Sequence, residues 1–122
     1  MRFLKLAVIA VSLLAANAVS SAAELPKSVL HIITLRYKPG TSEADKTKVI
    51  DATKKMATAY PGITRLWFKK IKVQVEGMSD IIVMEFKDQA AFDAYGPAKP
   101  HKDWEAVYMP LRDSSNTQDV TN

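Results

Sequence analysis

The stretch VLHIITLRY, residues 29–37, alternates in the manner of a β-strand. One face would carry Val29, His31, Ile33, Leu35 and Tyr37, and the other Leu30, Ile32, Thr34 and Arg36. Both faces are apolar at the start of the strand, so each needs a cover. The turn-forming residues 38–40, Lys-Pro-Gly, end the strand.

The segments that follow alternate between helix and strand patterns. We predict a helix over 42–60, strands over 63–75 and 80–87, a short helix from Asp88 to about 96 and a last helix from Pro100. This order predicts an α+β, ferredoxin-like βαββαβ sandwich whose helices cover one face of the sheet. A second copy of the sheet is the simplest cover for the other face, so we expect a homodimer.

The ends of the chain differ from its centre. Residues 1–23 have the basic start, short apolar run and small residues of a secretory signal peptide, with cleavage after Ala23 or after Ala18. We therefore expect a secreted or periplasmic protein without a stable membrane anchor once the signal is removed. The folded domain is predicted over 24–113. Residues 114–122 are predicted to be a polar tail with room for one short closing strand, near 117–121.

Composition limits the function. Arg2 and Lys5 would leave with the signal, which reduces the formal net charge from +4 to +2, and no nucleic-acid-binding motif occurs. The chain has no cysteine, which excludes disulfides, iron–sulfur clusters and thiol nucleophiles. With two histidines and scattered carboxylates we expect no metal site, and we expect no cofactor.

Short motifs spread along the chain carry a family resemblance. They are LHII at 30–33, YKPG at 37–40, PGI at 61–63, MEF at 84–86, FDAY at 92–95 with His101 after five more residues, and PL at 110–111. In this order they resemble the stress-responsive A/B barrel (Dabb, dimeric α/β barrel) family. The resemblance implies a ferredoxin-like subunit whose sheet pairs with that of a second copy to form a dimeric α+β barrel.

The same resemblance implies candidate site residues. One plant branch of the family closes polyketide chains by aldol condensation, using a histidine base, an assisting tyrosine and a histidine on the first strand. His101, Tyr95 and His31 match these places. The tentative catalytic residues are therefore His101 as base and Tyr95 as hydrogen-bond donor to an enolate oxygen. Ligand-binding candidates are His31, Ile33, Leu35 and Trp104.

The sequence departs from the family pattern in two places. The family often has HPAH before the last helix, whereas residues 98–101 read AKPH and keep only the second histidine. The closing strand is usually apolar, whereas residues 117–121 read TQDVT. Each candidate also has a structural alternative. His31 fits a core histidine, His101 a helix cap packed on Trp104, and Tyr95 a buried aromatic with a satisfied hydroxyl.

Three functions remain open. The preferred one is an exported dimer that binds a small apolar or aromatic molecule in a cleft between sheet and helices. The second is a cofactor-free lyase, cyclase or oxygenase that uses His101 and Tyr95. Because thioester polyketide substrates are made in the cytoplasm, export argues against a cyclase. The third is a structural stress protein without a ligand.

Overall fold

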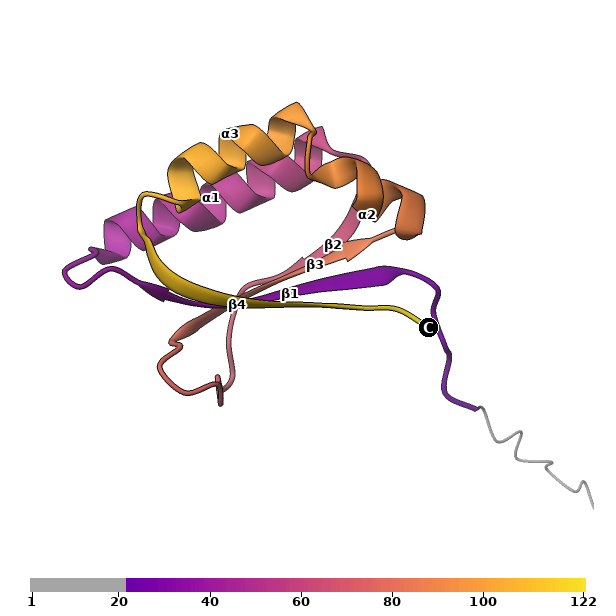
Figure 1. Cartoon of the computed structure of the whole chain (residues 1–122), viewed down its shortest axis with the longest axis horizontal. Helices are drawn as coiled ribbons and strands as arrows, with labels where there is room; N and C mark the ends of the chain where they lie inside the picture. The colour runs from indigo at the N-terminus through magenta and orange to yellow at the C-terminus, as the bar shows by residue number, and fades with distance from the viewer. Residues whose placement is uncertain (1–21) are drawn as a thin grey trace, which may run out of the picture.

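The computed structural model describes residues 22–122, which form a sheet covered on one face by helices (Figure 1). The strands are β1 (Val29–Tyr37), β2 (Ile63–Trp67), β3 (Asp80–Phe86) and β4 (Arg112–Val120), and the helices are α1 (Glu43–Ala59), α2 (Gln89–Tyr95) and α3 (Lys99–Tyr108). All strand pairs are antiparallel, in the order β2-β3-β1-β4. This topology confirms the ferredoxin-like sandwich.

Positions 1–21 of the predicted signal peptide lie outside the residues that the structure describes. Within residues 22–122, no helix is long and apolar enough to cross a membrane.

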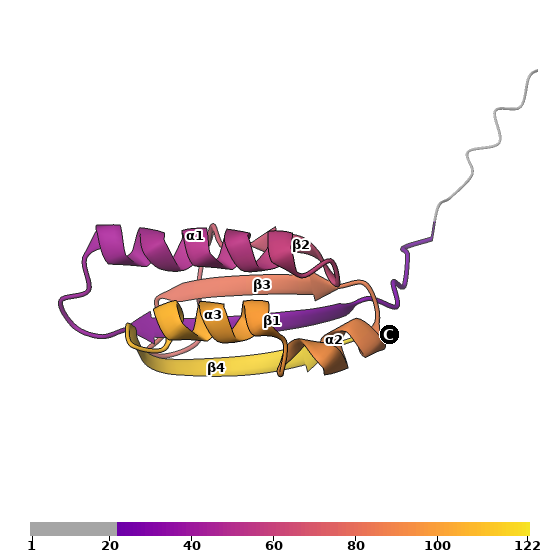
Figure 2. The same cartoon turned by 90° about the horizontal axis from the view of Figure 1, so that it is seen from above.

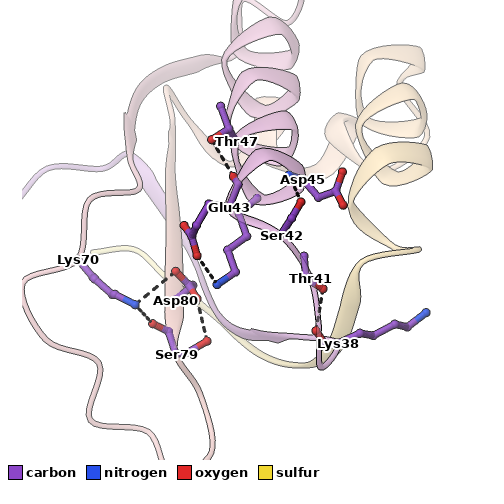
Figure 3. Close-up of polar contacts among 10 residues, drawn as sticks. Lys38, Thr41, Ser42, Glu43, Asp45, Thr47, Lys70, Ser79 and Asp80 are labelled. Atoms are coloured by element: carbon purple, nitrogen blue, oxygen red, sulfur yellow. Dashed lines mark hydrogen bonds and ion pairs between the residues drawn. The ribbon is translucent and has the colours of Figure 1, made fainter.

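The turn between β1 and α1 is held by short-range hydrogen bonds (Figure 3). The Thr41 hydroxyl donates to the Lys38 carbonyl at 2.7 Å, and the Ser42 hydroxyl accepts from the Asp45 amide at 3.1 Å. Ser42 is therefore the N-cap of α1, and the acidic residues Glu43 and Asp45 occupy the first turn, where the helix dipole favours negative charge.

The core lies between the sheet and the helices. It contains residues from β1, β3 and all three helices; the fully buried large side chains are Phe86, Leu35, Met56, Ile82, Met84 and Val49, together with Thr53. Seen from above, α1 and α3 run side by side over the sheet, and α2 covers its end near the C-terminus (Figure 2). This arrangement brings α2 and the start of α3 over the first residues of β1.

No helix of the described chain covers the opposite face of the sheet (Figure 1). Ile32, Val83 and Trp67 are neighbours across β1, β3 and β2, and Trp67 is 45% exposed. We call this surface the open face. The two-faced character predicted for the first strand is thus present in the fold.

The second strand is shorter than predicted. β2 ends at Trp67, and residues 68–79 form an irregular arm on the side of the open face (Figure 1). Its partner β3 begins only at Asp80, and no other strand within residues 22–122 pairs with the arm. Lys70 closes the base of the arm by donating to the Ser79 carbonyl and lying 3.4 Å from Asp80 (Figure 3).

The closing strand is longer than predicted. β4 runs from Arg112 to Val120 and pairs with β1 along its length, so the expected boundary at 113/114 falls inside a strand. Backbone hydrogen bonds do not depend on apolar side chains, and an edge strand can leave its polar side chains in water. The end is also tied to the lead-in, because Thr121 donates to the Ser28 carbonyl at 2.9 Å.

Candidate functional site

His31 pairs with a carboxylate that the sequence did not single out. It lies directly opposite Asp119 in the β1–β4 ladder, and its Nδ1 donates to Asp119 Oδ1 at 2.5 Å. The histidine side chain is 16% exposed. With Nδ1 as the donor to a carboxylate, the neutral form of the ring has its lone pair at Nε2. Among residues 22–122, no atom is hydrogen bonded to this Nε2.

His101 is held in the first turn of α3. Its Nδ1 donates to the Gly96 carbonyl at 2.8 Å, and its Nε2 lies 3.5 Å from Glu105 Oε1, one helical turn later. A carbonyl oxygen can only accept, so Nδ1 is the protonated nitrogen here too. The two imidazoles differ at Nε2: that of His101 faces a carboxylate, and that of His31 is unengaged.

The ring of Tyr95 lies between the two imidazoles. Its centroid is 6.1 Å from that of His31 and 4.2 Å from that of His101. The structure therefore brings together the three residues that the resemblance pointed to. The Tyr95 hydroxyl, however, contacts the sulfurs of Met56 at 3.4 Å and Met84 at 3.5 Å.

Burial dominates the chemistry of Tyr95. Desolvation, with a smaller contribution from Glu105, raises the pKa of the Tyr95 phenol far above its usual range. The hydroxyl therefore stays protonated at any physiological pH. The aromatic ring, rather than the hydroxyl, joins the two histidines, and a donor role for Tyr95 stays a prediction.

Aromatic rings continue on both sides of this group. The Phe92 ring lies 5.8 Å from His31, and Trp104 stacks on His101 at 5.8 Å with 25° between the planes. Trp104 donates from Nε1 to the Thr53 hydroxyl at 2.9 Å, which ties α3 to α1. The exposed edge of His31 is thus flanked by aromatic carbon.

The other predicted ligand-binding residues are dispersed. Ile33 and Leu35 are enclosed in the core, 4% and 0% exposed. Trp104 lines a hollow, but this hollow lies between α1 and α3 and not between sheet and helices as expected. Ile33 and Leu35 therefore pack in the core beneath the helices. Their buried side chains leave almost no surface for the ligand contacts that were predicted.

Two polar residues of the site, Asp119 and Glu105, were not predicted from the sequence. Asp119 meets His31 only through the register of a long-range ladder, which a sequence does not specify. Glu105 lies four residues after His101, so helical spacing could have suggested that contact. Among residues 22–122, no group of three or more His, Cys, Asp or Glu side chains is placed to hold a metal ion.

These features define an α+β protein of the ferredoxin-like class with a histidine–carboxylate pair at one edge of its sheet. A family model described as stress responsive A/B barrel domain, Dabb, matches residues 29–122. The chain belongs to this family.

Solved structures share the fold at low identity. A hydroxynitrile lyase from Passiflora edulis has a TM-score of 0.71 and 16% identity, over 78% of this chain and 93% of its own. A Dabb family protein from Mesorhizobium loti gives 0.66 and 20%, over 78% and 96%. A dimeric ferredoxin-like protein of unknown function from Thermobifida fusca gives 0.67 and 17%, over 80% and 92%. Among curated proteins, none matches the chain.

Proposed function

We propose that this Dabb protein binds a small aromatic or apolar molecule that carries a hydroxyl group, against the exposed edge of His31. The observation that carries the proposal is the unengaged Nε2 of His31, held as an acceptor by the bond from Nδ1 to Asp119. Phe92 and Tyr95 flank the same imidazole. The linings of small-ligand sites are mostly apolar with a few oriented polar atoms, and these three side chains have that composition.

Two probes that differ in whether the ring oxygen carries a proton or a methyl group test this proposal. 4-Propylphenol can donate to Nε2, whereas 4-propylanisole has the same ring and tail but no hydroxyl proton. We expect the phenol to bind about two- to tenfold more tightly, the value of one neutral hydrogen bond. His31→Leu should remove this difference, and His101→Leu, the control at the other imidazole, should retain it. Equal binding of the two probes to the parent protein would contradict the proposal.

The proposal includes a homodimer that buries the open face. The apolar neighbours Ile32, Val83 and Trp67 support it, because soluble monomers rarely expose large contiguous apolar patches. The Thermobifida fusca protein is described as dimeric, which also supports it.

The proposal also includes export. Residues 1–23 have the pattern of a signal peptide, and cleavage after Ala23 would leave five residues ahead of Val29, where β1 begins. Mass spectrometry of the protein recovered from the periplasm or medium tests this, with Glu24 as the expected first residue. A full-length chain retained in the cytoplasm would contradict it.

A second candidate is a cofactor-free lyase, favoured by the pairing of His31 with Asp119. A carboxylate at Nδ1 orients an imidazole and stabilises the cation that forms when Nε2 takes a proton. A hydroxynitrile lyase shares the fold. With a cyanohydrin, Nε2 would remove the hydroxyl proton, the carbon–carbon bond would break to leave an aldehyde, and cyanide would leave with the proton as HCN.

Mandelonitrile tests the lyase reading, because benzaldehyde release is followed by its absorbance. If the protein is a lyase, Asp119→Asn should reduce kcat by about 10- to 100-fold, the usual cost of losing an orienting partner. Tyr95→Phe should have a smaller effect, since the Tyr95 hydroxyl faces Met56 and Met84. If the parent protein releases benzaldehyde no faster than the His31→Ala variant does, the lyase proposal is wrong and binding remains the proposed function.

A further inference from the structure

An apolar hollow with charged residues at its rim lies between α1 and α3. Its volume is about 270 Å³. Its walls are Ala52, Lys55, Met56 and Ala59 of α1 and Lys99, Pro100, Asp103, Trp104 and Val107 of α3. None of His31, Tyr95 and His101 lines it, although Trp104 and Met56 also contact His101 and Tyr95.

Side-chain size explains why the two helices leave space here. The α1 positions recur at spacings of three and four residues, which places Ala52, Met56 and Ala59 on the face turned to α3. Two of the three are alanines, and the opposing residue, Trp104, has the bulkiest type of side chain. Small residues that face a large planar one leave a gap on its flank.

The floor of the hollow accepts only apolar groups. Met56 and Trp104 are 2% and 4% exposed. The only polar side-chain atom of Trp104, Nε1, is engaged by the Thr53 hydroxyl at 2.9 Å. A ligand group on this floor therefore finds carbon and sulfur and no free hydrogen-bonding atom, and burial of apolar surface would drive its binding.

The rim carries one uncompensated positive charge. Lys99 Nζ lies 2.6 Å from Asp103 Oδ2, so these two charges offset each other. On α1, Asp51 pairs with Lys54 at 3.7 Å, and no carboxylate within residues 22–122 pairs with Lys55. The rim thus favours a ligand with a single negative charge.

We propose that this hollow binds a small monocarboxylate with an apolar tail. The tail would lie against Ala52, Ala59 and Val107, with Met56 and Trp104 beneath it. The carboxylate would lie beside the ammonium group of Lys55. The volume is just below the range of roughly 300–1,000 Å³ found for drug-sized ligands. A chain or ring of modest size therefore fits better than a long-chain lipid.

Octanoate and octanol, which share a tail and differ in charge, test the assignment by isothermal titration calorimetry at low salt. We expect octanoate to bind more tightly than octanol to the parent protein. Lys55→Met should weaken octanoate by about two- to fivefold, as for an exposed ion pair, and leave octanol unchanged. Lys48→Met is the matched control, since Lys48 is on α1 outside the hollow and should leave both affinities unchanged.

Filling the hollow tests its position. Ala52→Leu and Ala59→Leu should each weaken octanoate more than tenfold while the protein still melts cooperatively. In a Trp67→Phe background, octanoate should also change the fluorescence of Trp104. His31→Leu should leave octanoate binding intact, so this proposal and the one at His31 can fail separately. No binding at millimolar octanoate, equal binding of octanol, or no effect of either leucine variant would overturn the assignment.

Discussion

The Nδ1 of His31 lies 2.5 Å from the carboxylate of Asp119. The two residues are 88 positions apart in sequence and face each other across the β1–β4 ladder. Asp119→Ala removes the acceptor, so we expect the proton of the neutral ring to redistribute between Nδ1 and Nε2. The ¹⁵N chemical shifts of the His31 ring measure this. The fold should lose no more than about 1 kcal/mol, as for other exposed pairs. An unchanged ¹⁵N pattern would mean that Asp119 does not set the tautomer.

The hydroxyl of Thr53 links two helices. It accepts from Trp104 Nε1 at 2.9 Å and donates to the Val49 carbonyl at 2.7 Å. Thr53→Val leaves a buried indole N–H without a partner, at a cost of about 1–3 kcal/mol in the free energy of unfolding. Urea denaturation measures this cost. Thr58→Val is the control, because the exposed Thr58 donates in the same way to Lys54 and bonds nothing else.

Gly62 is required by close packing. A Cβ there would lie 2.6 Å from the Tyr60 ring and 2.9 Å from Ala91 Cβ. The ring has little freedom to move, because its hydroxyl donates to the Ala91 carbonyl at 2.6 Å. We expect Gly62→Ala to destabilise the fold by about 1–3 kcal/mol.

Gly96 offers a matched comparison for Gly62. Its backbone is helical, and a Cβ would meet nothing within 4 Å. Gly96→Ala should therefore be neutral or stabilise the fold by about 0.4–1 kcal/mol, because alanine restricts the unfolded chain. Thermal melts of both variants check this, and equal losses would contradict the packing argument.

The open face should control self-association. Val83 lies at its centre, opposite Ile32 on one side and Trp67 on the other. Val83→Lys would bury a charge in the proposed interface, so we expect sedimentation analysis to show a dimer for the parent and a monomer for the variant. Ala90→Lys adds the same charge to an exposed position of α2 and should leave the dimer intact. A parent protein that sediments as a monomer would exclude the proposed dimer.

Stability should depend on pH through Glu85. Hydrogen bonds from Arg65 and Ser28 lower the pKa of the Glu85 carboxyl from 4.5 to about 2. The folded state therefore binds this proton less readily than the unfolded state. The stabilisation is fully present above about pH 5 and is lost as the pH falls from 4.5 towards 2.

A glutamine substitution isolates this contribution. Glu85→Gln cannot titrate, so its urea midpoint should fall less between pH 6 and pH 3 than that of the parent. Asp93→Asn is the control, since it changes an exposed carboxylate that receives a hydrogen bond only from Gln89. If the two variants lose stability equally with acid, the Arg65–Glu85 contact does not account for the dependence.

Local patterns predicted most of the elements but misjudged two lengths. The apolar residues of 68–75 favoured a continuous second strand, yet no strand of residues 22–122 pairs with them, and the chain leaves the sheet at Trp67. The polar residues of 114–122 indicated a tail with room for one short closing strand, yet β4 pairs with the edge of β1 from Arg112 to Val120. In both cases a long-range partner, and not local composition, decided where the strand ended.

The sequence by itself determined the order of helices and strands and the two-faced first strand. It also indicated that the two histidines occupy positions that match the site of one branch of the family. Periodicity and turn residues encode these features locally. Only the tertiary structure decided that Asp119 faces His31, that Tyr95 presents its ring to both imidazoles, and that Ile33 and Leu35 are closed off. The physical reason is that strand register and helix packing are set by contacts between distant residues, which no local pattern specifies.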